Sequence, residues 1–241
     1  MTARDAAWDD LRRRATARPV GPFASGLTGS LPPPAQRYLG AVIAEGTPLA
    51  AAAQLEMRGR IKIGRWLPFR ARQLLAPSLG TVWMATVAGV IRGSDRYVGG
   101  DGAMAWKLFG LVPVMRADGA DVSRSAAERA AAESIWVPTA VAGDPTASWS
   151  AAGESAVDVA FSVEDHRVGL RHTIDADGRL QHSQIARWGD PDNTGAWAQH
   201  PFGVEAPDHR TFGGVTIPCA GSVSWRPAIH SPRPVWPTPV P

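Results

Sequence analysis

The chain has 241 residues, with 25 basic and 22 acidic side chains and a formal net charge of +3. Hydrophobic residues make up 44% and charged residues 20%, which excludes wholesale disorder and favours a folded chain that buries a core. No run approaches the roughly 18 consecutive apolar residues of a membrane span, and the N-terminus lacks the apolar region of a secretory signal. The single cysteine, Cys219, cannot form an internal disulfide and fits a reducing compartment, so we expect a cytoplasmic protein.

The basic residues are nearly all arginines, and they are scattered along the sequence except for Arg12, Arg13 and Arg14. A protein that binds nucleic acid is expected to show a basic stripe. We therefore predict no nucleic-acid partner and interpret the short arginine run as a solvated helix surface.

The N-terminal part predicts helices and a linker. Residues 2–18 have the spacing of a short helix, whereas residues 19–34 are rich in Gly, Pro and Ser and indicate a loop. A second helix is expected to begin after Pro34 and to stop at Gly46. We assign residues 1–30 to an N-terminal helix and linker.

Beyond this region the apolar residues recur with a period of two. Residues 55–63 and 66–75 alternate between apolar and polar side chains, which predicts strands with one solvated face. Residues 81–92 predict a third, more apolar strand, and residues 103–109 predict a strand that returns after a Gly-Gly-Asp-Gly turn. Short consecutive strands of this kind favour an antiparallel meander.

One segment has the composition of a helix. Residues 121–136 contain strong helix formers, and Asp121 or Ser123 stands at the expected capping position. Arg129 and Glu133 are spaced i, i+4, so their side chains can pair on one face. The alanines of this segment allow close packing against a sheet.

Strands resume after this helix, at residues 156–163, 166–175 and 179–188, and residues 211–226 predict another strand pair or one long strand. Residues 231–241 carry five prolines and predict an extended tail.

These elements predict an α+β, mainly β protein. We expect one domain over residues 31–230, formed by a large curved antiparallel sheet of roughly eight to eleven strands that wraps a central helix. In this expectation the sheet is a half-barrel, and the N-terminal helices lie beside it.

Ten tryptophans must be accommodated in this fold. They can line an apolar pocket for a hydrophobic small molecule, or they can simply fill a thick core, and both interpretations stay open. In the first, the ligand is lipid-like or polycyclic and Arg129, Glu133 and Arg187 orient its polar end. The ligand-binding candidates are Trp66, Phe69, Trp83, Trp106, Arg129, Trp136 and Arg187.

Glu133 is the candidate for acid–base chemistry. A carboxyl between an apolar environment and Arg129 can serve as a general acid or base, so the alternative function is a cofactor-independent isomerase, cyclase or hydrolase. The competing interpretation is an ordinary i, i+4 ion pair on a helix surface.

Other chemistries lack their motifs. The sequence has no phosphate-binding loop, dinucleotide fingerprint, nucleophile elbow or Cys-x-x-Cys motif, so we predict no cofactor. Potential metal ligands occur at His200, Glu205, Asp208 and His209, but their spacing matches no zinc pattern and the segment resembles a loop. We predict no metal site there.

The order of several segments resembles the DUF6544 family of uncharacterised bacterial proteins. The most specific segment is residues 120–141, ADVSRSAAERAAAESIWVPTAV. The other matching segments are residues 31–39, 65–73, 81–85, 100–114, 186–195 and 212–225. The resemblance implies a fold similar to the lipoprotein carriers, in which a curved antiparallel sheet clasps a helix. It assigns no catalytic residue, because a fold does not fix a function.

Overall fold

The structure is a computed structural model, and it describes residues 3–18 and 21–225. The predicted extended tail, residues 231–241, lies outside the described residues. Helices and strands alternate in blocks, with two long runs of strands separated by a helical segment. The prediction of a mainly β, antiparallel protein is therefore confirmed.

The helices lie before the strands and midway along the chain. In chain order they are α1 (Ala3–Thr16), the 3-10 helix η1 (Ser25–Thr28), α2 (Pro33–Val42), α3 (Ala120–Ala132), the 3-10 helix η2 (Glu133–Trp136) and α4 (Pro138–Ala142).

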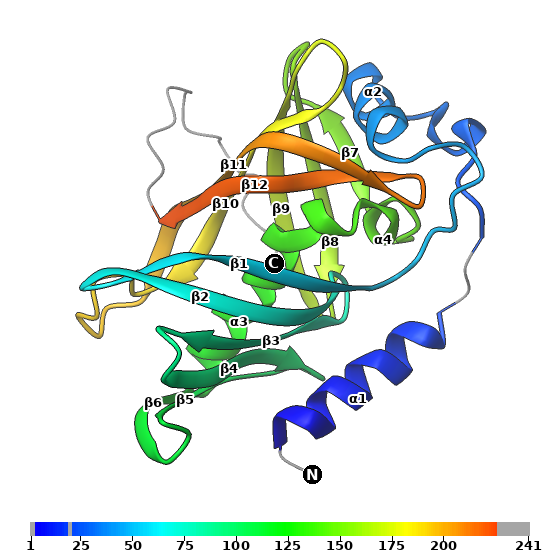
Figure 1. The fold of residues 1–241 in the computed structure, drawn as a ribbon. Coiled ribbons are helices and arrows are strands. Elements are labelled where there is room, and N and C mark those ends of the chain that lie inside the picture. Colours follow the sequence, from blue (N-terminus) through cyan, green and yellow to red (C-terminus); the bar gives the residue numbers. More distant parts are fainter. Residues whose placement is uncertain (1–2, 19–20, 226–241) are drawn as a thin grey trace.

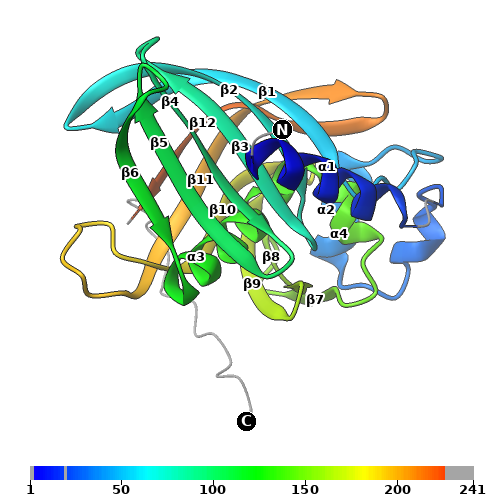
Figure 2. The same ribbon diagram turned by 90° about the horizontal axis from the view of Figure 1, so that it is seen from below.

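The first sheet is a six-stranded antiparallel meander in which sequence neighbours are also spatial neighbours. Its strands are β1 (Ala53–Ile63), β2 (Arg65–Ala76), β3 (Gly80–Val87), β4 (Ile91–Val98), β5 (Asp101–Leu108) and β6 (Val112–Asp118). Because the strands run antiparallel, the β1–β2, β3–β4 and β5–β6 loops all lie at the same end of the sheet (Figure 2).

The second sheet repeats this plan with six strands in the order β12-β11-β10-β9-β8-β7. Its strands are β7 (Ser148–Ala151), β8 (Ala156–Val163), β9 (His166–Ile174), β10 (Leu180–Gly189), β11 (Ala198–Phe212) and β12 (Val215–Trp225).

Helix α3 lies between the two sheets and contacts strands of both, chiefly β5 and β10 (Figures 1 and 2). Ala127, Ala130 and Ala131 are fully buried in the core that α3 shares with the second sheet. Small side chains let the helix backbone approach a sheet closely, so the alanine-rich composition is explained by this position. The chain leaves the first sheet after β6, passes through α3 and enters the second sheet at β7. The strands therefore form two sheets instead of one continuous sheet.

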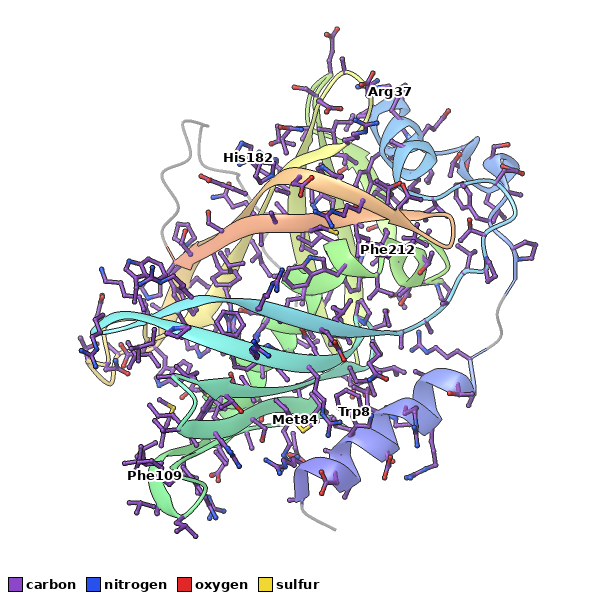
Figure 3. The ribbon with its side chains drawn as sticks, in the orientation of Figure 1. Trp8, Arg37, Met84, Phe109, His182 and Phe212 are labelled. Atoms are coloured by element: carbon purple, nitrogen blue, oxygen red, sulfur yellow. The ribbon has the colours of Figure 1, made fainter. Side chains whose placement is uncertain are left out.

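Helix α1 covers part of the other face of the first sheet, which we call the outer face. Leu11 of α1 is fully buried with Leu74 and Val82 of the sheet. Trp8 and Met84 lie close together at the edge of this contact (Figure 3).

Two local predictions were wrong in the first half of the chain. The strand predicted over residues 81–92 is interrupted after Val87, because Ala88 and Gly89 adopt φ values of 49° and 74° and form a tight hairpin. No side chain caps α3. The hydroxyl of Ser123 instead accepts a hydrogen bond from the backbone N–H of Gly102.

The loop expected around His200 was also wrong. Residues 198–212 form the long strand β11, with register shifts against β12 between Glu205 and His209. Such irregularities disrupt the strict alternation that identifies a strand in a sequence.

Candidate functional site

An apolar surface lies on the inner face of the first sheet, the face toward α3. Trp83 and Trp106 are buried here with ring centroids 5.6 Å apart, and the Phe69 ring lies 5.9 Å from that of Trp83. Partly buried apolar side chains surround the two indoles. They are Met57, Ile61, Leu67, Phe69, Ala71, Ile91 and Met104. Because these side chains keep some solvent access, the surface can accept further apolar contacts.

An interior polar cluster of Asp95, Arg129 and Glu133 borders this surface. Arg129 donates from Nε to Oε1 of Glu133 and from Nη1 to Oδ2 of Asp95, both at 2.8 Å. Its guanidinium carbon lies 5.0 Å from the Trp83 ring centroid, and Trp106 Nε1 donates to Asp95 Oδ1 at 2.8 Å. Burial opposes the charge on Arg129, but the charges of Glu133 and Asp95 outweigh it and raise its pKa.

Gln73 completes the surroundings of Glu133. Its side chain is fully buried, and Nε2 donates both to Oε2 of Glu133 and to Oγ1 of Thr81. Its Oε1 has no hydrogen-bond partner among the described residues. The predicted pair of Arg129 and Glu133 is therefore confirmed, but it is largely buried instead of lying on a helix surface. Both oxygens of Glu133 already accept hydrogen bonds, and its catalytic role stays a prediction.

Arg187 enters the same interior from β10 of the second sheet. Its guanidinium carbon lies 4.6 Å from the ring centroid of Phe202 and 4.7 Å from that of Trp225. Nε donates to the carbonyl oxygen of Ser125 at 3.2 Å, and Nη2 lies 3.3 Å from its hydroxyl. These partners carry no negative charge.

Arg187 forms no ion pair among the described residues. The nearby carboxylates Glu128, Glu133 and Asp95 pair with other cations. Burial and, after it, the charge of Arg129 lower the pKa of Arg187 to about 9, although these carboxylates act in the opposite direction. At neutral pH the side chain is therefore a cation in a costly environment.

The structure divides the predicted ligand-binding residues. Phe69, Trp83, Trp106 and Arg129 lie together, whereas Arg187 belongs to the second sheet and lies within electrostatic range of Arg129. Trp66 lies elsewhere.

Trp66 is 57% exposed, and it stands opposite Lys62 on the outer face. Trp136 belongs to η2 and packs against the cores around the second sheet, with Nε1 donating to the Pro218 carbonyl oxygen at 3.2 Å.

Asp95 and Gln73 were not among the residues predicted for the site. Both occupy positions in their strands that face α3, where the neighbouring residues of the same parity are mostly apolar. A polar residue at such a position was an available signal. Phe202 was missed because β11 was not predicted.

The metal-ligating residue types do not assemble into a centre. In the part of the chain that the structure describes, no three His, Cys, Asp or Glu side chains are grouped so as to hold a metal ion. A hollow of about 730 Å³ lies on the outer face of the first sheet, away from the interior polar cluster.

The protein is thus a two-sheet, mainly β protein in which one helix places charged residues between the sheets. Residues 22–231 match DUF6544, a family of unknown function, and the chain belongs to this family. Comparisons with curated proteins and with solved structures found no match. Among residues 3–18 and 21–225, no helix has both the length and the hydrophobicity needed to span a membrane.

Proposed function

We propose that this protein binds a lipid-like molecule with an acidic head group between the two sheets, against the inner face of the first sheet. The apolar part lies on Phe69, Trp83 and the partly buried side chains around them, where it removes apolar surface from water. Such burial contributes roughly 25 cal/mol for each Å². The proposal includes a curved, half-barrel arrangement of strands, similar to that of the lipoprotein carriers.

The observation that carries the proposal is the state of Arg187. A partly buried guanidinium without a carboxylate partner, such as that of Arg187, loses part of its hydration and gains little in return. A carboxylate or phosphate on the ligand supplies the missing charge and accepts the free N–H groups. Charge-assisted hydrogen bonds of this kind contribute about 1.5–3 kcal/mol.

The ligand's acidic group gives a direct test. We would titrate the protein with a long-chain fatty acid and with the alcohol of the same chain length, following tryptophan fluorescence. The fatty acid is expected to bind about ten- to a hundredfold more tightly, from the energy of the charge-assisted bonds. Arg187→Gln is expected to remove this preference, whereas Arg210→Gln, at an exposed arginine on β11, should preserve it.

Tryptophan variants locate the apolar part. Trp83→Phe should weaken binding of both compounds, and Trp66→Phe should leave it unchanged because Trp66 lies on the other face of the sheet. The proposal is wrong if the folded protein responds to neither compound, or if Arg187→Gln retains the full preference for the acid.

A further inference from the structure

The end of the first sheet formed by the β1–β2, β3–β4 and β5–β6 loops presents exposed apolar side chains. Seven of the ten large hydrophobic residues that are exposed in the described chain lie around two of these loops. We call these seven residues the apolar tips. They are Ile63, Trp66, Phe109, Leu111, Val112, Val114 and Met115. Clustering of this kind marks an interaction surface, because scattered single residues would be ordinary.

The outer face beside the apolar tips is basic. One row across the sheet consists of Arg58, Arg70, Arg92 and Lys107. In the strand register Arg58 stands opposite Arg70, Thr86 stands opposite both Arg70 and Arg92 on its two neighbouring strands, and Arg92 stands opposite Lys107. All four are exposed. We call them the basic row.

The basic row places four like charges on one face of the sheet. Like charges that stand opposite each other across strands are destabilising. In the portion of the chain that is described, none of the four side chains forms an ion pair. The hollow of about 730 Å³ is lined by Arg58, Arg70 and Arg92 together with one carboxylate, Glu56, so these cations border an open depression.

This surface combines cations, which suit an anionic partner, with apolar side chains, which suit an apolar phase. We propose that the apolar tips and the basic row dock the protein on an anionic lipid bilayer. Exposed Trp and Phe side chains favour the boundary between head groups and acyl chains, and nearby Arg and Lys side chains pair with anionic head groups. A nucleic acid would use the basic row but would leave the aliphatic tip residues Leu111 and Val112 without a role.

The position of the loops makes this docking geometrically possible. Phe109 projects from the β5–β6 loop at one extremity of the molecule, whereas Phe212 marks the β11–β12 loop on another side (Figure 3). Lys107 is two residues from Phe109, and Trp66 faces the same side of the sheet as the basic row. Insertion of the tips therefore brings the nearest cations to the head groups.

The test is co-sedimentation of the full chain with vesicles of phosphatidylcholine alone and with vesicles that also contain phosphatidylglycerol. Binding is expected only to the anionic vesicles, and it should weaken as salt rises. The triple variant Arg58→Gln/Arg70→Gln/Lys107→Gln should bind about a hundredfold more weakly, at about fivefold for each cation.

The apolar contribution has a matched control. Phe109→Ser with Leu111→Ser should weaken vesicle binding by about tenfold or more for each side chain. Phe212→Ser, which removes a side chain of similar exposure from another hairpin, should leave binding unchanged. The altered positions are exposed, and circular dichroism melting confirms that each variant is folded.

The outcomes decide the proposal independently of the fatty-acid titration, because no fatty acid is added. Loss of vesicle binding in the tip and charge variants, with Phe212→Ser unaffected, supports docking. Absence of binding to anionic vesicles, or equal losses in Phe212→Ser, overturns it. Binding to a DNA duplex without binding to vesicles also overturns it and identifies the basic row as a nucleic-acid surface.

Discussion

Replacing Arg129 by methionine tests whether the interior polar cluster holds the first sheet to α3. Methionine keeps a long, flexible apolar side chain but removes the guanidinium, including the two nitrogens that donate to Glu133 and Asp95. Asp95 and Glu133 then lose their hydrogen bonds from Nη1 and Nε, each 2.8 Å long. The cation above the Trp83 ring is lost as well.

The expected cost follows from the burial of the stranded carboxylates. Breaking a buried ion pair by removing one partner costs about 3–5 kcal/mol, because a charge is left uncompensated. The side chains of Arg129, Asp95 and Glu133 are 19%, 16% and 11% exposed, so water recovers part of this loss. We expect a destabilisation of about 3 kcal/mol.

Arg124 is the matched control on the same helix. It also pairs with a glutamate four residues later, Glu128, and lies 4.2 Å from the ring centroid of Trp188. Its side chain is 40% exposed, and without it Glu128 keeps the backbone N–H of Trp188, together with a histidine and a glutamine. Arg124→Met should therefore cost about 1 kcal/mol or less.

The measurement is urea denaturation of the unaltered protein, Arg129→Met and Arg124→Met at neutral pH. A triple variant that combines Arg129→Met with Asp95→Asn and Glu133→Gln should recover part of the lost stability, because no charge is stranded. Equal costs for Arg129→Met and Arg124→Met would refute the reasoning. A triple variant less stable than Arg129→Met would also count against uncompensated charge as the cause.

Three further perturbations test a buried histidine and two glycines. Burial lowers the pKa of His172 to about 4, so the unfolded chain takes up a proton that the native state excludes, and stability should fall by about 3 kcal/mol as pH drops from about 6.5 toward 4. His172→Asn should show a smaller fall in urea denaturation, and an unchanged fall would contradict this. Gly93→Ala should destabilise by about 1–3 kcal/mol, because its Cβ would overlap the Trp106 ring. Gly40→Ala, at an exposed position of α2 where the Cβ meets nothing, should stabilise by up to about 1 kcal/mol in thermal melting.

Local periodicity was sufficient to predict much of the fold. Residues 55–63 and 156–163 alternate regularly because one face of each strand meets a core and the other meets solvent. The alanine-rich helix was predicted for a similar reason, since its composition suits close packing. The β3–β4 hairpin was missed because the apolar run of β3 continues through the turn to Ile91, and the non-glycine turn residue Ala88 gives no signal.

The basic row could not be predicted, because it depends on register. Arg58, Arg70, Arg92 and Lys107 are separated by at least 12 residues in the sequence, so they appear scattered. Strand pairing places them in one row. The absence of a basic stripe in the sequence therefore gave no information about the folded surface.

The charges between the sheets sharpen the case for an acidic ligand. Asp95, Arg129 and Glu133 together carry a net negative charge, and Arg187 carries the opposite charge nearby. If this arrangement compensated Arg187, its pKa would be held near the ordinary value. Burial and the charge of Arg129 instead outweigh the carboxylates and lower the pKa of Arg187 to about 9. Overall neutrality therefore does not satisfy Arg187, and a negative group in direct contact with its guanidinium would.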